Sequence, residues 1–294
     1  MRIGITGATG FVGTHLVAVA RNAGHEVIGF SRTPAPRAGF VEMRAWLPVK
    51  DADFSGLDAI VHLAGESIAG VWTKKKFAAI RRTRVDDTRA MIARLRQLPT
   101  PPKVIVSAGG VAWYGDGGEA ELPESAPPGC GFLSEVSQAW EQAAMEGTGF
   151  TRAVALRTGL VLGRDGGAAP LLRRIFRLCA GGRLGSGRQW MSWIHVTDLA
   201  RLYLHAVDCS ALQGPVNAVA PGVVRNAEFT RILARTMHRP AIFPVPAFAL
   251  RLLPRGMSDP VLHSQRAVPA AALAAGFSFL YPDLTGAACD VFAR

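Results

Sequence analysis

Cysteine, tyrosine and lysine are scarce in this chain of 294 residues. The four cysteines lie far apart and show neither metal-ligand spacing nor a disulfide framework, so we expect no bound metal and a reduced compartment. No apolar run approaches the ~18 residues of a membrane span, so we expect no membrane partner. A strand pattern that begins at residue 2 leaves no room for a signal peptide, which favours a cytoplasmic protein.

Charged residues are also few, but positive charge dominates among them. They make up 19% of the chain, while 49% of the residues are hydrophobic, as is typical of a globular protein. The 28 arginines and five lysines outweigh 22 acidic residues and give a net charge of +11. The only basic run of three is Lys74–Lys76, so we expect no nucleic-acid partner. An anionic cofactor and an arginine-biased genome are equally good explanations of the charge.

The most informative stretch is a glycine-rich turn near the start of the chain. An apolar run precedes Gly7–Gly13, and apolar residues at helical spacing follow it. Gly7 permits a tight turn, Gly10 lets the backbone approach phosphates, and Gly13 lets helix and strand pack closely. Free N–H groups and the helix dipole would face the anion. The pattern predicts a turn that binds a dinucleotide pyrophosphate, with an ordinary turn as the alternative.

The end of the next strand pattern, His25–Phe30, indicates which dinucleotide binds. An acidic residue at this position would bind the 2′-hydroxyl of NAD. Ser31 and Arg32 stand there instead. A guanidinium beside a hydroxyl suits the 2′-phosphate of NADP, because arginine makes charge-assisted bidentate contacts with phosphate. We therefore predict NADP as the cofactor, with a solvated loop arginine as the alternative.

Strand and helix patterns alternate in the first half of the chain and become irregular after residue 165. The patterns fall, in chain order, at residues 59–64, 73–98, 103–107, 134–146 and 152–157. This alternation predicts an α/β fold with a Rossmann-like, doubly wound parallel sheet. We expect an NADP-binding Rossmann domain over residues 1–165 and a smaller, irregular C-terminal lobe over 166–294. Part of 188–220 is expected to return to the Rossmann domain.

Further motifs extend the pattern over nearly the whole chain. Together with the glycine turn, His62–Gly65 and Ile194–Ala200 resemble motifs of the extended short-chain dehydrogenase/reductase superfamily, which includes NAD(P)-dependent epimerases and dehydratases. The segments Ala64–Gly70, Leu156–Gly163 and Gly185–His195 resemble an atypical epimerase-family group with a distinctive C-terminal segment. A homodimer is compatible with this resemblance, because dimers are common in the group.

The resemblance implies NADP as the cofactor and a set of residues that would contact it. The residues that match the group's cofactor contacts are Ser31, Arg32, Leu63, Ala64, Arg84 and Val161. Residues of the glycine turn and of neighbouring strand ends complete the predicted cofactor site: Gly7, Gly10, Phe11, Val12, Gly13, Gly65 and Ser107.

The superfamily's usual catalytic residues are missing from this sequence. They are a serine or threonine, then a tyrosine, then a lysine four residues later whose cation lowers the pKa of the phenol. None of the three tyrosines (Tyr114, Tyr203 and Tyr281) is followed by lysine at that spacing. Leu133 and Ser137 fall at the tyrosine and lysine positions. The resemblance therefore implies a cofactor fold without establishing epimerase activity.

Two other residues are candidates for the missing proton chemistry. Tyr114 follows the fourth strand pattern, and its phenol could donate a proton; the alternative is an aromatic ring that packs beside Trp113. Glu66 follows the third strand pattern and could act as a base if burial raised its pKa. The alternative for Glu66 is a helix cap or a solvated loop carboxylate.

Arg157, Arg188, Trp193 and His195 form the predicted substrate-binding set, because cations and indoles suit a polar ring or a phosphate. The alternatives are a loop that only closes over the cofactor for Arg188, and an imidazole that anchors a strand end for His195. We predict an NADP(H)-binding, epimerase-family or oxidoreductase-like protein that acts on a small carbonyl or sugar-like molecule. The alternative is a non-catalytic, NADPH-binding regulatory or scaffold protein.

Overall fold

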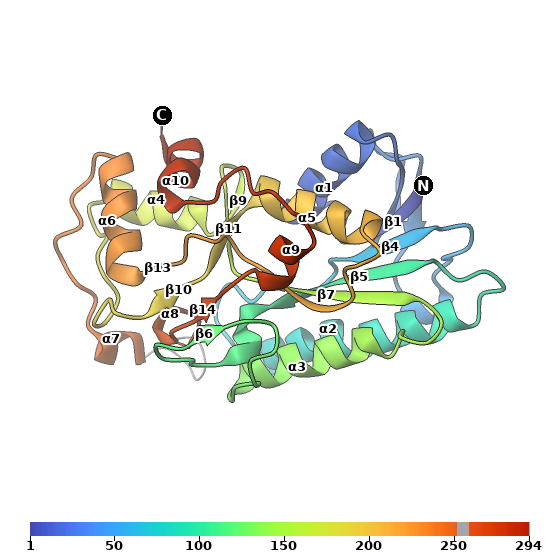
Figure 1. Ribbon diagram of the computed structural model, residues 1–294, viewed down its shortest axis with the longest axis horizontal. Helices are drawn as coiled ribbons and strands as arrows, with labels where there is room; N and C mark the ends of the chain where they lie inside the picture. Colours follow the sequence, from blue (N-terminus) through green and yellow to red (C-terminus); the bar gives the residue numbers. More distant parts are fainter. Residues whose placement is uncertain (252–258, 294) are drawn as a thin grey trace. The chain divides into compact units, whose positions relative to one another are not determined.

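The computed structural model describes residues 1–251 and 259–293 and is drawn in Figure 1. The chain forms two compact units that alternate along the sequence. The first unit comprises Met1–Gly109, Val136–Leu156 and Ala200–Val216. The second unit comprises Gly110–Glu135, Arg157–Leu199 and Asn217–Arg294. The boundary that we expected near residue 165 came from periodicity along the chain, whereas these units are set by contacts in space.

A seven-stranded sheet forms the centre of the first unit. Its strands are β1 (Arg2–Thr6), β2 (Glu26–Ser31), β3 (Glu42–Ala45), β4 (Ala59–His62), β5 (Val104–Gly110), β7 (Arg152–Thr158) and β12 (Gly214–Ala218). Their order is β12-β7-β5-β4-β1-β2-β3, and the pairings from β5 to β3 are parallel. Most residues of β1, β2, β4 and β5 are buried, as expected for strands covered on both faces.

Helices cover both faces of this sheet. They are α1 (Phe11–Asn22), α2 (Lys74–Arg96), α3 (Phe132–Met145) and α5 (Val196–Asp208). Figure 1 shows α2 and α3 along one face and α1 and α5 along the other, which confirms the predicted doubly wound α/β architecture. Helix α2 begins where the Thr73 side chain accepts a hydrogen bond from the Lys76 N–H, and prolines follow its end.

Short connections complete the first unit and its core. A 3-10 turn, η1 (Val49–Asp51), follows β3. The ring of Phe30, a residue of β2, lies 5.0 Å from the ring of Phe54, and Trp46 belongs to the same core cluster. Among the described residues, no helix combines the length and apolar composition that a membrane crossing requires.

The second unit is built from small sheets and short helices. Its strands are β6 (Glu121–Leu122), β8 (Leu160–Gly163), β9 (Gly166–Gly167), β10 (Trp190–Met191), β11 (Trp193–His195), β13 (Val224–Arg225) and β14 (Arg266–Ala267). Its helical segments are η2 (Val111–Tyr114), α4 (Ala169–Arg177), α6 (Asn226–Thr236), α7 (Ala247–Arg251), α8 (Asp259–Leu262), α9 (Ala270–Ala274) and α10 (Leu284–Phe292). Residues of α4, α6 and α10 share one core cluster with Trp193. The second unit includes residues 110–135, which we expected in the Rossmann domain, as well as most of residues 166–294.

Replacing Gly13 by alanine should destabilise the first unit. A Cβ at this position would lie 2.8 Å from the Ala8 Cα and would clash with the Gly7 carbonyl oxygen, so backbone atoms would have to shift. We expect Gly13→Ala to lower the free energy of unfolding in urea by about 1–3 kcal/mol. The control is Ala18→Ser on the exposed face of the same helix, for which we expect a change below about 0.5 kcal/mol. Equal losses in the two variants would contradict the packing argument.

Candidate functional site

The glycine turn joins β1 to α1 with backbone atoms packed too closely for side chains. Gly7 has a φ of +68°, and a Cβ there would lie 3.0 Å from the carbonyl carbon of Leu63. The Gly10 N–H donates to the Gly7 carbonyl at 2.9 Å. Gly10 then begins α1 without a side-chain cap, and no acidic residue occupies the first turn. The first N–H groups of α1 are therefore presented at a bare backbone surface, which is what an anion site needs.

The carboxyl ends of four neighbouring strands lie at one level beside this turn. In the parallel register, Thr6 pairs with Phe30 and with His62, and His62 pairs with Ser107. Ligands of open α/β sheets bind outside this edge. Most of the predicted cofactor residues of the first unit follow or end one of these strands or lie in the glycine turn. Ser107 lies inside β5, and Arg84 comes from α2.

A chain of hydrogen bonds through Thr6 holds the loop that follows β4. The N–H groups of Leu63 and Ala64 both donate to Thr6 Oγ1, each at 3.1 Å. These two bonds occupy the lone pairs of the hydroxyl oxygen, so the Thr6 hydroxyl donates its proton to His62 Nδ1 at 2.7 Å. The loop that would lie along a dinucleotide is therefore tied to the end of β1.

His62 continues this chain into α2 as a neutral imidazole. With Nδ1 accepting, we assign the proton to Nε2, which donates to Thr88 Oγ1 at 3.0 Å. The Thr88 hydroxyl donates in turn to the backbone carbonyl of Arg84. Complete burial, reinforced by the positive charge of Arg84, lowers the pKa of His62 from 6.5 to about 3. Sequence reasoning missed this role of His62, because the register that pairs it with Thr6 cannot be read from spacing.

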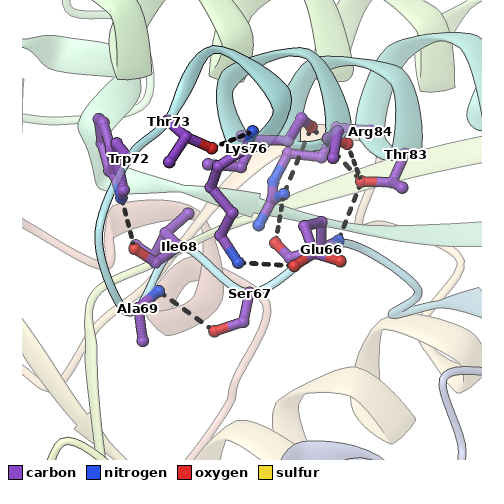
Figure 2. Close-up of polar contacts among 11 residues, drawn as sticks. Glu66, Ser67, Ile68, Ala69, Trp72, Thr73, Lys76, Thr83 and Arg84 are labelled. Carbon is purple, nitrogen blue, oxygen red and sulfur yellow. Dashed lines mark hydrogen bonds and ion pairs between the residues drawn. The ribbon is translucent and has the colours of Figure 1, made fainter.

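Glu66 is bound to α2 through all of its polar groups, as Figure 2 shows. Its N–H donates to Thr83 Oγ1 at 2.9 Å, and its carbonyl accepts from Arg84 Nη1 at 2.8 Å. Its carboxylate pairs with Lys76 Nζ at 2.6 Å. The hydrogen bond from Lys76, together with the charges of Lys76, Arg32 and Arg84, holds the pKa of Glu66 below its usual value. Glu66 was a candidate general base only if burial raised the pKa of its carboxyl group. Its pKa is lowered instead, so this condition is not met.

Arg84 places a half-buried guanidinium beside the loop after β4. Burial lowers its pKa from 12.5 to about 10, although Glu66 acts in the opposite direction. The guanidinium lies 5.0 Å from the Trp140 ring centroid, and a Cβ on Gly65 would come within 3.5 Å of its central carbon. Trp140 Nε1 is buried and has no hydrogen-bond partner among the described residues. A desolvated cation and an unsatisfied donor are typical of a place where a polar ligand supplies partners.

Arg32 differs from Arg84 because its side chain is exposed. It follows directly from the end of β2, and it makes no ion pair or side-chain hydrogen bond with another residue that the structure describes. Ser31 is half-buried beside it and accepts a bond from the Thr33 N–H at 3.3 Å. The guanidinium of Arg32 is therefore free to meet an anionic group at the strand end.

Tyr114 lies in a buried polar cluster of the second unit. Its hydroxyl accepts a hydrogen bond from Arg157 Nη1 at 2.8 Å and donates to Asn217 Oδ1 at 2.8 Å, with the Pro123 carbonyl a second acceptor at 3.1 Å. Burial raises the pKa of Tyr114, although Arg157 opposes this shift. The Trp113 ring packs edge-on at 5.1 Å. This setting favours the packing alternative over a proton donor.

Two of the predicted substrate-binding residues are buried inside the second unit. Arg157 is 2% exposed, its guanidinium stacks 3.6 Å from the Trp113 ring centroid, and it also donates to the Glu124 carbonyl. Trp193 is fully buried and donates its indole N–H to the Gly222 carbonyl at 2.8 Å. These contacts give both side chains a role in holding the unit together.

His195 anchors the start of α5, as the alternative for this residue supposed. Its Nδ1 accepts from the Thr197 N–H at 3.2 Å, so Nε2 carries the proton and donates to Asp290 Oδ2 at 3.2 Å. Its ring also stacks on Tyr281, with the centroids 3.9 Å apart. The imidazole thus joins the end of β11 and the first turn of α5 to a carboxylate of α10.

The remaining predicted residues fall into different settings. Arg188 is exposed in the loop before β10, and Val161 lies in β8 paired with Ile194. Ser107 is buried in β5, and its hydroxyl donates to the Ala108 carbonyl at 3.1 Å. Among the described residues, no group of three His, Cys, Asp or Glu side chains is arranged to hold a metal ion.

Comparison with known proteins places these features in a family. The model of the NAD dependent epimerase/dehydratase family matches residues 3–218, and a domain of unknown function, DUF1731, matches residues 245–291. The epimerase family protein SDR39U1 of Bos taurus is 36% identical over 299 residues, which cover 100% of both chains.

Two solved structures are similar along the whole chain. The crystal structure of human epimerase family protein SDR39U1 with NADPH has a TM-score of 0.92 and 34% identity, and the match covers 99% of each chain. A nucleoside-diphosphate sugar epimerase from Corynebacterium glutamicum has a TM-score of 0.80 and 32% identity. This second match covers 100% of the present chain and 58% of the other.

Substituting His62 should change how stability depends on pH. Between pH 6.5 and about 3, the unfolded chain binds a proton at His62 that the folded chain does not, so the free energy of unfolding falls as pH decreases. The slope from this residue is at most about 1.4 kcal/mol per pH unit, and it vanishes above pH 6.5. We expect His62→Gln to be less stable at neutral pH but to lose less stability on acidification. Urea denaturation at several pH values measures both slopes.

The control for this measurement is His238→Gln, which removes an exposed histidine. We expect its dependence on pH to follow that of the unsubstituted protein. If His62→Gln lost stability as steeply as the unsubstituted protein between pH 6.5 and 4, the imidazole would not be held neutral by the fold.

Proposed function

Because the chain belongs to the NAD-dependent epimerase/dehydratase family, we propose that it binds NADPH and acts as an oxidoreductase on a small carbonyl or sugar-like molecule. The observation that carries the proposal is the bare glycine turn at the edge where the ends of four strands meet. The human relative, similar over 99% of each chain, has been crystallised with NADPH, which supports the same cofactor here.

The residues of the turn fit a pyrophosphate. Gly7, Gly10 and Gly13 bring the backbone so close together that added Cβ atoms would meet neighbouring main-chain atoms. The N–H groups of Phe11 and Val12 begin the uncapped helix, where the positive end of the helix dipole favours an anion. We assign these five residues to the two phosphates.

The end of β2 fits the extra phosphate that distinguishes NADPH from NADH. The guanidinium of Arg32 is exposed and carries no ion pair within the described residues, and Ser31 offers a hydroxyl beside it. No carboxylate stands at this position to bind a 2′-hydroxyl or to repel a 2′-phosphate. We assign Ser31 and Arg32 to the 2′-phosphate.

The loop after β4 would run along the cofactor. Leu63 and Ala64 are held by the Thr6 hydroxyl, and Gly65 leaves room for the guanidinium of Arg84. NADPH supplies a hydride when it is bound. The part of this chain is to orient the cofactor and to place positive charge near it.

Proton transfer needs a source outside the usual pair of residues. Tyr114 is buried and hydrogen-bonded to Arg157 and Asn217, and Glu66 is an ion-paired carboxylate with a lowered pKa. We propose that water supplies the proton. A sugar-like substrate is supported by the likeness to the Corynebacterium glutamicum nucleoside-diphosphate sugar epimerase, at 32% identity.

The contacts of Tyr114 and Glu66 also favour a second candidate function, a protein that binds NADPH without turnover. An enzyme without the usual tyrosine and lysine needs another proton source, and both side chains that we considered for this role are engaged in structural contacts. A regulatory or scaffold protein would need only the cofactor site.

Removing the charge at Arg32 should weaken NADPH binding selectively. A charge-assisted hydrogen bond contributes about 1.5–3 kcal/mol, so we expect Arg32→Ala to raise the Kd for NADPH by roughly 10- to 100-fold. The Kd for NADH should stay within about twofold, since NADH has no 2′-phosphate. The control is Arg37→Ala, another exposed arginine of the same loop. Fluorescence titration of the unsubstituted protein and of both variants with each dinucleotide gives the six constants. Equal weakening for both dinucleotides in Arg32→Ala would contradict the assignment of Arg32.

Turnover separates the two candidate functions. The NADPH-loaded protein is mixed with a panel of carbonyl compounds and nucleotide sugars, and the absorbance of NADPH is followed. The enzyme proposal predicts consumption with at least one class, at a rate that Tyr114→Phe leaves unchanged in the folded fraction. Saturable NADPH binding with no consumption across the panel would favour the regulatory candidate.

A further inference from the structure

A cavity of about 960 Å³ in the second unit is lined by a concentration of positive charge. Four arginines contribute to it: Arg183, Arg231, Arg235 and Arg239. His238 also lines it, and no acidic residue is among the lining residues that the structure describes. None of these residues belongs to the predicted cofactor or substrate sets.

Two separate segments bring these arginines together. Arg231 and Arg235 are four residues apart on α6, and Arg239 continues the same spacing just beyond the helix end, where His238 has a φ of 51°. Arg183 comes from the loop after α4.

Backbone hydrogen bonds hold the Arg183 loop against its neighbours. The Leu184 N–H donates to Asn226 Oδ1 at 2.8 Å, which ties the loop to the first residue of α6. The Val245 N–H donates to the Arg183 carbonyl at 2.9 Å, which ties it to the segment after Arg239. The backbone that carries Arg183 is therefore held by the two segments that supply the other lining residues.

Most of this charge has no partner within the described part of the chain. Arg231 pairs with Glu228 at 3.4 Å, and both side chains are about half exposed. Arg183, Arg235 and Arg239 make no ion pair or side-chain hydrogen bond with another described residue. Like charges four residues apart repel each other on a helix. The dipole at the end of α6 favours Arg235 and Arg239, but it does not account for Arg183.

We propose that this cavity binds a phosphate-rich anion, and that it is a ligand site distinct from the glycine turn. Guanidinium groups supplied by two segments of the chain suit the several oxygens of a diphosphate or bisphosphate group, because each guanidinium can make bidentate contacts. The rest of the lining includes Ala234, Pro240, Ala241, Ile242 and Pro244, a wall suited to the compact, uncharged part of such a ligand. The proposal does not depend on whether NADPH is turned over.

The phosphate can come from a free metabolite or from a lipid headgroup. Ile242 lines the cavity and is 72% exposed, and its neighbour Phe243 is 71% exposed. Exposed apolar side chains beside a basic site are also found where proteins meet anionic membranes. The chemistry that the arginines recognise is the same in both cases, and separate arms of the experiment distinguish them.

The first arm titrates pyrophosphate into the full-length protein saturated with NADPH, by calorimetry. We expect one saturable site whose affinity for pyrophosphate is at least tenfold lower in Arg235→Gln/Arg239→Gln. The affinity of Arg235→Lys should be intermediate, because lysine keeps the charge but lacks the planar set of hydrogen-bond donors of a guanidinium. The matched control is Arg174→Gln/Arg177→Gln, which removes two positive charges from α4 of the same unit. The control should bind pyrophosphate as the unsubstituted protein does.

The second arm measures sedimentation with vesicles of phosphatidylcholine alone or with phosphatidic acid. Binding that requires phosphatidic acid, Arg235 and Arg239, and that Ile242→Ser/Phe243→Ser weakens, assigns the site to a lipid headgroup. Pyrophosphate binding without vesicle binding assigns it to a free metabolite. Saturable binding in neither arm, or an equal loss in the control variant, would overturn the proposal.

Discussion

The organisation of the candidate site depends on one buried hydrogen-bond chain between the ends of β1 and β4. The Thr6 hydroxyl accepts hydrogen bonds from two N–H groups of the loop after β4 and donates a hydrogen bond to His62. His62 in turn donates a hydrogen bond to the Thr88 hydroxyl in α2. Every member of the chain has a partner, which is the condition under which a buried polar network gives rigidity instead of a penalty. The glycine turn and the loop beside it are therefore held in one arrangement.

Arginine side chains occupy three different kinds of setting in this protein. Arg157 is a buried structural cation stacked on an aromatic ring. Arg84 is desolvated at the edge of the candidate cofactor site, where its pKa is lowered to about 10. Arg32 and, in the second unit, Arg183 are exposed and make no ion pair with another described residue. Exposed guanidinium groups of this kind are suited to bind anionic small molecules.

Much of the fold and part of the site could be predicted from sequence. The glycine turn was predictable because Gly7 and Gly13 fill positions that tolerate no side chain, and the alternation of patterns identified the sheet. Strand β3 was missed because its four residues are largely exposed and show no apolar pattern. The burial of Tyr114 and the pairing of His62 arise from contacts between distant segments. Spacing along the chain therefore identified candidate residues but did not predict their burial or their hydrogen-bond partners.

We infer that the Thr6–His62 hydrogen-bond chain positions the loop after β4 for NADPH. The most direct measurement is the Kd of Thr6→Val for NADPH, because valine keeps the shape of threonine while leaving the N–H groups of Leu63 and Ala64 without their acceptor. We expect Thr6→Val to bind NADPH more weakly than the unsubstituted protein while keeping the circular dichroism spectrum of the folded chain. Unchanged affinity in the folded variant would contradict it.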